Sequence, residues 1–316
     1  MKRVIALLFC LLILLTSCGQ GVKQGDLKNV GLLVPETIND QGWGSKAYSG
    51  ILQIQSEYDV DVYYKEDMNT QFVVERAVDE FVQKDVNLIF GHGNEYAEYF
   101  SEITPKYPDI QFITFNTDAV NDNVTSLQFE GYAMGFFAGM VAGHMTKTNY
   151  IGMIPAFEWQ PEVKGFYDGA KFQNESVKID IEYVNHFDDV EKALQIFDDM
   201  KAKQIDVYYP AGDSYSVPVI EKVKENGLYA IGYVSDQSDL GNYTVLTSTI
   251  QHVETLYEWV AKRYSQGLLE SGNVSFDFQE DAITLGNFSP LVDKEFIKEI
   301  QGYVDRYKET GKLPNQ

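Results

Sequence analysis

Cysteine is scarce in this chain. The 316 residues include two cysteines, Cys10 and Cys18, and Cys10 lies in an N-terminal segment that we expect to be cleaved. Cys18 would then be the only thiol of the mature chain. We therefore expect no intrachain disulfide, no cysteine-ligated metal and no catalytic cysteine.

Other residues that build enzyme or metal sites are few and scattered. The four histidines have no metal-ligand spacing, and the chain lacks both a Gly-x-Ser-x-Gly elbow and a phosphate-binding glycine loop. Acidic pairs such as Asp188-Asp189 are more typical of solvated helix ends than of catalytic carboxylates. We expect no enzyme activity, no catalytic residue, no metal site and no cofactor. The histidines are His92, His144, His186 and His252.

Positive charge is in short supply. Lysine and arginine number 25 against 47 aspartate and glutamate residues, which gives a formal net charge of -22. Such a surface repels phosphate backbones, so direct nucleic-acid binding is disfavoured. A helix-turn-helix could be drawn around residues 190–219, but alternating strand and helix units fit the same residues better. The acidic residues there would also face the phosphates.

The longest uninterrupted hydrophobic run is Val4–Leu15, which follows Lys2 and Arg3. This run is shorter than the ~20 apolar residues of a membrane span. Its last residue begins the motif Leu15-Thr16-Ser17-Cys18. This pattern predicts a lipoprotein signal peptide over residues 1–17, with lipid attached to Cys18. The alternative is an ordinary signal peptide with a chance cysteine. Residues 18–28 are polar and glycine-rich and predict a tether, so the mature chain is expected on the outer face of the cell membrane.

From residue 29 onward, short apolar runs alternate with amphipathic segments. This alternation predicts an α/β chain with two successive doubly wound parallel sheets, and hence two lobes joined by a hinge with a ligand in the cleft between them. The expected strands are 30–34, 60–64, 86–90, 110–115, 124–129, 150–154, 179–183, 205–209 and 229–233. The expected helices are 43–57, 71–83, 95–107, 132–145, 162–172, 190–203 and 217–225.

Ligands of open α/β sheets bind at the carboxyl ends of the strands, so the candidate binding residues are those that follow strands. Trp43 either offers a large stacking face to a ligand or packs in the core, and the sequence does not favour one of these roles over the other. Asn39 and Asp40 offer a mixed donor and acceptor edge or cap the first helix. His92 follows a strand between glycines, although that loop can also be a turn capped by Asn94. The remaining strand-end candidates are Phe157, Trp159, Gly212, Asp213 and Asp236.

Several sequence blocks carry a family resemblance: Ile38–Trp43 with Ala47–Gly50, Phe112–Phe129, Gly131–Ala142, Phe166–Ala170, Ile231–Gln237 and Asn287–Leu291. They resemble the basic membrane protein family of PnrA-like substrate-binding lipoproteins. The resemblance implies a type I periplasmic-binding-protein fold that closes on a purine nucleoside and serves an ABC permease or a membrane sensor. It further implies one lobe of residues 29–128 plus 251–279 and another of 129–250 plus 280–316.

Four further motifs are Thr37–Asp40, Trp159–Val163, Tyr209–Asp213 and Val234–Leu240. They are similar to a branch of the family that regulates competence gene expression. That likeness implies a positive regulator acting through a membrane partner; a transport receptor without a regulatory role, or a direct DNA-binding activator, are the alternatives.

At three positions the chain departs from the family pattern. Asn116 stands where the family usually has aspartate, and Gln251 stands where it usually has lysine. Val234 stands where the family has the first aspartate of the block that continues here with Asp236 and Gln237. We assign Asn116 and Gln251 to the expected site. If both face one cleft, the two halves of a charge pair are replaced together, which keeps the cleft electrically balanced but removes charge-assisted contacts to a ribose.

Overall fold

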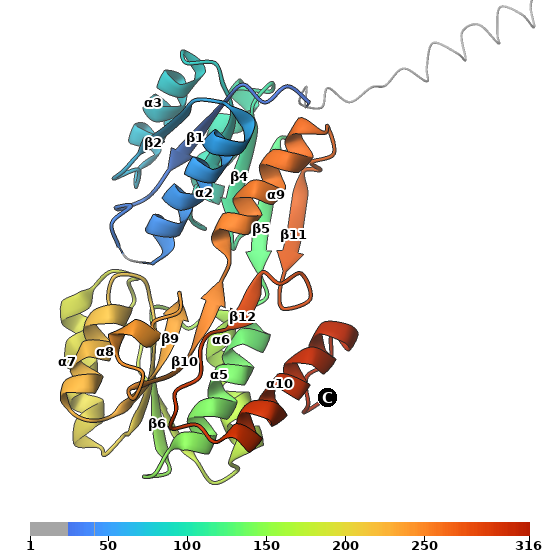
Figure 1. Ribbon diagram of the computed structural model, residues 1–316. Coiled ribbons are helices and arrows are strands. Elements are labelled where there is room, and N and C mark those ends of the chain that lie inside the picture. The colour runs from blue at the N-terminus through green and yellow to red at the C-terminus, as the bar shows by residue number, and fades with distance from the viewer. Residues whose placement is uncertain (1–24, 41) are drawn as a thin grey trace, which may run out of the picture.

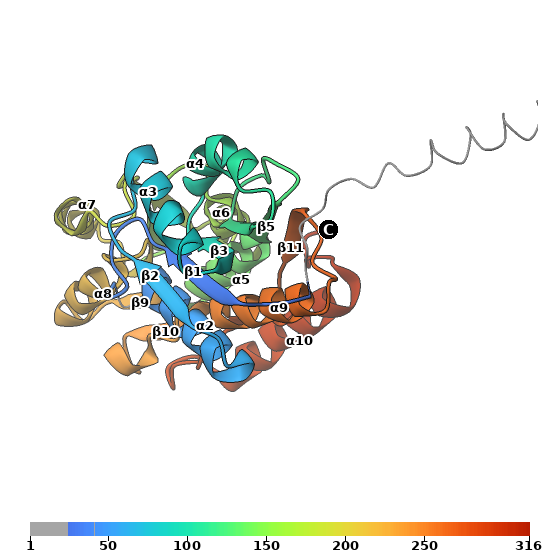
Figure 2. The ribbon, with the colours of Figure 1, turned by 90° about the horizontal axis from the view of Figure 1, so that it is seen from above.

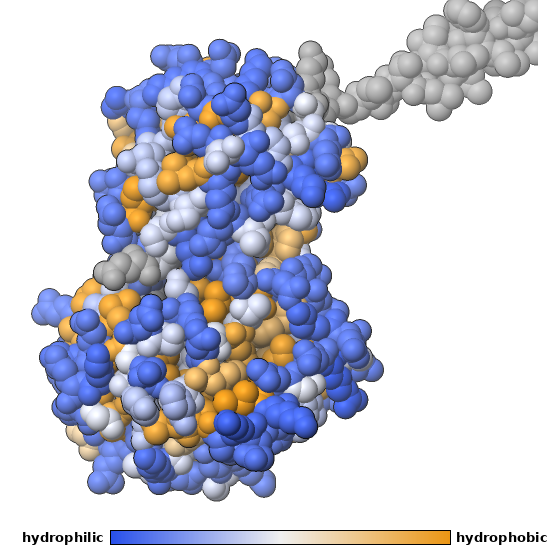
Figure 3. All heavy atoms as spheres, in the orientation of Figure 1, coloured by the Kyte–Doolittle hydropathy of each residue, from blue (hydrophilic) through white to orange (hydrophobic). Residues whose placement is uncertain are grey.

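The computed structural model describes residues 25–40 and 42–316 (Figure 1). The predicted signal peptide, Cys18 and residues 18–24 of the predicted tether lie outside the described residues. Over the described ranges the chain forms two six-stranded sheets. The molecule narrows to a waist between two lobes, and hydrophilic residues cover most of the face seen in Figure 3.

The first sheet has the strand order β11-β5-β4-β3-β1-β2, and all its pairs are parallel. Its apolar residues alternate between two faces: Leu32 packs with α2 and α9, whereas Leu33 packs with α3 and α4 (Figure 2). The strands are β1 (Asn29–Leu33), β2 (Val62–Lys65), β3 (Val86–Gly91), β4 (Gln111–Phe115), β5 (Val124–Phe129) and β11 (Gly272–Phe276). The helices are α2 (Trp43–Tyr58), α3 (Gln71–Val82), α4 (Tyr96–Ile103), η1 (Thr104–Lys106) and α9 (Val253–Ser265).

The second sheet has the order β12-β10-β9-β8-β6-β7 and is parallel except for the edge strand β12, which runs antiparallel to β10. Helix α8 lies beside α7, and α10 lies beside α5 (Figure 1). The strands are β6 (Tyr150–Pro155), β7 (Lys178–Ile181), β8 (Val207–Ala211), β9 (Tyr229–Val234), β10 (Val245–Gln251) and β12 (Ile283–Leu285). The helices are α5 (Gly131–Met145), α6 (Pro161–Gln173), α7 (Val190–Ala202), α8 (Ser216–Glu225), η2 (Ser238–Leu240) and α10 (Lys294–Thr310).

The prediction of two doubly wound lobes is confirmed, while some details differ. The sequence analysis predicted no helix or strand after residue 233, so it missed strands β10, β11 and β12 and helices α9 and α10. Strands β11 and β12 are the short edge strands of the two sheets. The helix expected over 95–107 ends at Ile103, and a separate 3-10 turn, Thr104–Lys106, contains Pro105, which lacks the N–H that would continue the α-helix. The helix-turn-helix alternative is wrong, since strand β8 lies between α7 and α8.

Helices α5 and α6 approach each other closely through glycines. A Cβ atom at Gly139 would lie 2.1 Å from the Phe166 carbonyl oxygen, and one at Gly135 would lie 2.2 Å from the Glu162 carbonyl oxygen. From the other side, a Cβ at Gly169 would lie 1.9 Å from the Phe136 carbonyl oxygen. Only glycine fits these positions, so the glycine spacing of α5 sets where α6 begins and hence where Glu162 lies.

The chain passes between the two sheets three times. The crossings lie between β5 and α5, between β10 and α9, and between β11 and β12. Several short crossings at one waist are the arrangement that permits a hinge motion of two rigid lobes. Within the described ranges, no helix has both the length and the hydropathy needed to span a bilayer.

Candidate ligand-binding cleft

A cavity of about 690 Å³ lies between the lobes, within the usual size range of small-molecule sites. Its walls come from the carboxyl ends of strands in both sheets, as the strand-end rule predicts. The first lobe contributes Pro35, Glu36, Trp43, Asn69, His92, Gly93, Asn94, Glu95, Tyr99, Asn116, Gln128 and Phe129. Glu130 and Gly131 lie at the first crossing. The remaining lining residues are Phe157, Trp159, Gln160, Pro161, Glu162, His186, Phe187, Asp188, Asp213, Tyr233, Val234 and Gln251.

The structure brings most of the predicted site residues together at this cavity. The residues that line it are Trp43, His92, Asn116, Phe157, Trp159, Asp213 and Gln251. Asn39, Asp40, Gly212 and Asp236 are not among the lining residues. These four lie in the loops that shape the cleft.

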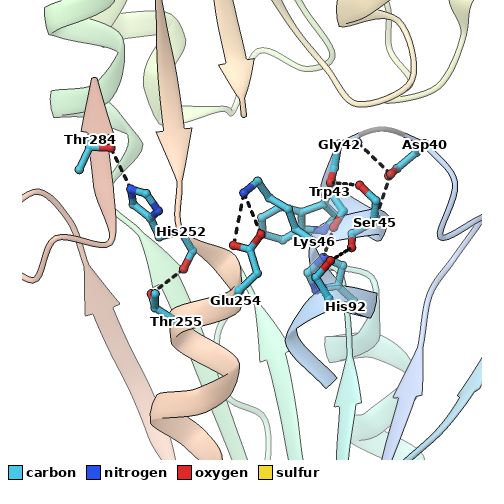
Figure 4. A network of polar contacts seen from close by, with 11 residues as sticks. Asp40, Gly42, Trp43, Ser45, Lys46, His92, His252, Glu254, Thr255 and Thr284 are labelled. Atoms are coloured by element: carbon cyan, nitrogen blue, oxygen red, sulfur yellow. Dashed lines mark hydrogen bonds and ion pairs between the residues drawn. The ribbon is translucent and has the colours of Figure 1, made fainter. Parts of the chain in front are cut away.

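Asp40 organises the start of helix α2. Its carboxylate accepts hydrogen bonds from the backbone N–H groups of Gly42, Gly44 and Ser45 at 3.0, 2.6 and 2.9 Å (Figure 4). The residue at the cap position itself is Gly42, which has no side chain to make a capping bond. Of the two roles considered for the Asn39-Asp40 pair, the structure shows capping by Asp40. These bonds position Trp43, the first residue of α2.

Asp236 anchors the C-terminal block that resembles the family. Its carboxylate accepts the backbone and side-chain N–H groups of Asn287 at 3.1 and 2.7 Å. Gly212 lies against the ring of Tyr215, where a Cβ would be 2.1 Å from the ring. Asp236 therefore fixes a loop of the second lobe, and Gly212 leaves room for the Tyr215 ring beside that lobe's strand end.

Trp43 is both packed and available to a ligand, so neither alternative for this residue excludes the other. Its indole stacks on His92 with centroids 4.3 Å apart and meets the edges of Phe115 and Phe129 at 5.7 and 6.0 Å. It is half-buried and remains part of the cavity wall. A stacking face supported on its other side by fixed rings costs little ordering when a flat ligand binds.

His92 is fully buried, and both of its ring nitrogens are engaged. Nε2 donates to the Trp43 carbonyl at 2.9 Å, and Nδ1 accepts from the Tyr257 hydroxyl at 3.0 Å. Burial lowers the pKa of His92 to about 3, so the imidazole is neutral at physiological pH. His92 therefore supports Trp43 and ties α2 to α9 across the end of β3. Asn94 does not cap α4, whose cap position is Glu95.

The second lobe presents its own aromatic wall. Phe157 stacks on Trp159 with centroids 5.4 Å apart and planes at 15°, and Phe187 meets both rings edge-on. Trp159 is 53% exposed, which is high for a tryptophan and leaves its face open to the cleft. Exposed aromatic groups at a cleft are typical of recognition surfaces.

The three departures from the family pattern meet at the same cavity: Asn116, Val234 and Gln251 all line it. Asn116 takes a left-handed conformation with φ 53° and accepts the Phe129 N–H at 3.1 Å. Val234 is also left-handed, with φ 64°, which is strained for a β-branched residue. Gln251 is nearly buried and contacts the Met134 sulfur at 3.5 Å.

The sequence analysis missed most of the acidic groups of the cleft. Glu36, Glu95, Glu130, Glu162 and Asp188 line it together with Asp213, and the described lining contains no lysine or arginine. The same strand-end rule could have found them, because Glu36, Glu162 and Asp188 follow β1, β6 and β7. Asp188-Asp189 was interpreted as a solvated helix start. Asp189 does cap α7, accepting from Lys192 N at 3.0 Å, but Asp188 points to the cleft.

Burial and mutual repulsion alter the ionisation of this acidic set. Burial, followed by the charges of Asp188, Asp40 and Glu95, raises the pKa of Asp213 well above its usual range. Burial chiefly raises the pKa of Glu95 to about 7, with further contributions from Asp188 and Glu36. Burial also raises the pKa of Glu162, although Tyr233 and Gln160 donate hydrogen bonds to it at 2.9 Å each.

Two lobes joined by three crossings, with an interlobe cavity at the strand ends, define a binding protein of the type I periplasmic class. The chain belongs to the family described as ABC transporter substrate-binding protein PnrA-like, whose model matches residues 27–316. The resemblance noted in the sequence is thus confirmed.

Relatives and solved structures agree with this assignment. The chain is 49% identical over 310 residues to the transcriptional activator protein med of Bacillus subtilis (strain 168), covering 98% of each chain. A crystal structure of a transcriptional activator of the comK gene from Bacillus halodurans is 50% identical with a TM-score of 0.83, covering 90% of this chain and 99% of that one. A solute-binding protein of an ABC transporter system from Aeropyrum pernix K1 shares the fold, with a TM-score of 0.74 and 21% identity over 91% of this chain and 81% of that one.

Proposed function

We propose that this protein is a lipid-anchored receptor that binds a small, nucleoside-sized organic ligand in the interlobe cleft and thereby regulates competence gene expression. The observation that carries the proposal is the cavity itself. Its volume is about 690 Å³, and aromatic faces from both lobes, Trp43 and the Phe157-Trp159 pair, border it. A planar base could stack on either wall while polar strand-end groups bind its edge and sugar.

The regulatory part of the proposal rests on the similarity to the two activators named above. The lipid anchor rests on the sequence around Cys18. A chain anchored outside the membrane, with a net charge of -22, is poorly suited to contact DNA, so we propose that lobe closure is read by a membrane partner. Ligand would shift the lobes toward the closed form by its higher affinity for that form. We further propose that the lobes comprise residues 29–128 plus 251–279 and residues 129–250 plus 280–316.

Thermal unfolding with a panel of purine nucleosides at micromolar concentration tests the receptor. Binding to the folded state should raise Tm with ligand concentration by mass action. A panel that leaves Tm unchanged at every concentration would contradict nucleoside capture. For regulation, deletion of the gene should lower competence-gene output, whereas unchanged output would contradict the regulatory role.

An ABC-transporter nucleoside receptor without a regulatory role is the second candidate. The family assignment and the fold shared with solute-binding proteins favour it. In that case deletion should reduce uptake of the ligand from the medium and leave competence-gene output unchanged. The two measurements in one deletion strain separate the two candidates.

A further inference from the structure

The charge of the cleft is one-sided, and this bears on the ligand. Acidic side chains from both lobes line it, whereas its described lining contains no lysine or arginine. Of the two histidines in the lining, His92 is buried and neutral, and His186 lies beside Asp188 with Nδ1 3.9 Å from its carboxylate. The first lobe supplies Glu95, and the second supplies Asp188 and Asp213. The repulsion between these groups therefore acts across the gap that closes when ligand binds.

Two of these carboxyl groups lack the partners that usually compensate buried acids. Among the described residues, none donates a hydrogen bond to the carboxyl group of Asp213, and the carboxyl group of Glu95 accepts one only from its own backbone N–H. Asp188, in contrast, accepts from the Ser214 hydroxyl, and Glu162 accepts from Tyr233 and Gln160. A desolvated carboxylate with no donor, or with only one, is costly, so Asp213 and Glu95 are groups that a ligand can satisfy.

Spacing distinguishes the kind of cation that fits. In the described part of the chain, no group of three or more His, Cys, Asp or Glu side chains is close enough together to hold a metal ion. The acidic groups are instead distributed around a cavity of about 690 Å³ that also has stacked aromatic walls. Carboxylates beside aromatic faces are the combination that binds organic ammonium groups.

We propose that the ligand of this cleft is an organic cation. Its ammonium or equivalent group lies between Glu95 of the first lobe and Asp188 and Asp213 of the second, and its flat or apolar part lies against Trp43 or Trp159. The cation replaces repulsion across the cleft by attraction to both lobes, and thus favours the closed form. This inference rests on the proposed receptor function and specifies its ligand class.

Matched probes that differ in charge but little in shape test the proposal. We would compare 5′-amino-5′-deoxyadenosine with adenosine, and tryptamine with tryptophol, by thermal shift and calorimetry at neutral pH. We expect the cationic member of each pair to bind at least about tenfold more tightly than the neutral member, a free-energy difference of about 1.4 kcal/mol.

The double variant Glu95→Gln/Asp213→Asn tests the assigned residues. It should lose the preference for the cationic probes, while Asp199→Asn, an exposed acid on α7, should retain it. Because the double variant removes buried repulsive charges, its Tm without ligand should be no lower than that of wild type, which shows that the variant is folded. A preference that survives in the folded double variant overturns the assignment.

The remaining outcomes separate this inference from the proposed function. Equal or tighter binding of the neutral members overturns the cation while leaving the receptor intact. If no probe and no purine nucleoside binds, both the cation and the receptor are overturned.

Discussion

The imidazole of His92 stacks on the indole of Trp43 with ring centroids 4.3 Å apart, and its Nε2 donates to the Trp43 carbonyl at 2.9 Å. Its other nitrogen accepts from Tyr257 at 3.0 Å. One buried, neutral ring therefore joins the aromatic wall of the cleft to helix α9, which follows the crossing at β10. A histidine that is neutral when folded also makes stability depend on pH.

For His92→Phe we expect reduced stability at about pH 8, because the Trp43 carbonyl and the Tyr257 hydroxyl lose their shared partner. In wild type the folded pKa is about 3 and the unfolded pKa is 6.5, so only the unfolded state gains this proton as pH falls between those values. Wild-type stability therefore falls below pH 6.5, and this loss is absent in the variant. The destabilisation measured by urea unfolding should be about 2 kcal/mol smaller at about pH 5 than at about pH 8. An equal difference at both pH values would contradict a neutral His92.

Replacing Glu95 by Gln should have the opposite pH dependence. The folded pKa of Glu95 is about 7 against an ordinary 4.5, so the folded state holds a proton that the unfolded state has released between those values. The contribution of Glu95 to wild-type stability therefore falls as the pH rises from 4.5 to about 7. Glu95→Gln should match wild type near pH 4.5 and exceed it above about pH 7, by up to about 3 kcal/mol. The control is Glu98→Gln on the exposed side of α4; a gain of the same size there would contradict the assignment.

A methyl group added between α5 and α6 should strongly destabilise the second lobe. In Gly139→Ala the new Cβ would lie 2.1 Å from the Phe166 carbonyl oxygen, so the helices must separate, at a cost of about 2 kcal/mol or more. Gly302→Ala in α10 is the matched control, because nothing lies within 4 Å of its Cβ. There helix propensity predicts stabilisation of about 0.5 to 1 kcal/mol. Chemical denaturation of both variants tests the contrast, and similar effects would count against close packing of α5 and α6.

Strain at Val234 predicts that a residue suited to the left-handed region stabilises the protein. Val234→Asn should raise the free energy of unfolding by about 1 kcal/mol, because asparagine tolerates the φ of 64° that strains a β-branched residue. Val234→Thr keeps the β-branched shape and should give no such gain. Equal stabilities of the two variants would show that backbone strain is unimportant at this position.

Substitution of Cys18 tests the predicted anchor. A chain with Cys18→Ala cannot take up lipid at that position, so it should move from the membrane fraction to the soluble fraction or the medium. Fractionation followed by immunoblotting measures this, with Cys10→Ala as the matched control that should stay in the membrane fraction. Membrane retention of the Cys18→Ala chain would mean that the signal was misinterpreted.

The sequence by itself determined the order of most strands and helices, because hydrophobic periodicity is a local property of each segment. It also indicated the family and the cleft residues Trp43, His92, Asn116 and Asp213, since the ends of parallel strands meet at one edge of a sheet. Strands as short as β12 leave too little pattern to detect, and their pairing depends on distant residues.

Only the tertiary structure decided which groups face one another. Asp40 and Asp236 have the polarity expected of ligand contacts, yet their oxygens bind backbone N–H groups that the fold brings to them. Glu95 and Asp213 lie more than a hundred residues apart, and their repulsion arises where two lobes meet. Charge and burial depend on distances in space, which the local pattern of a chain does not specify.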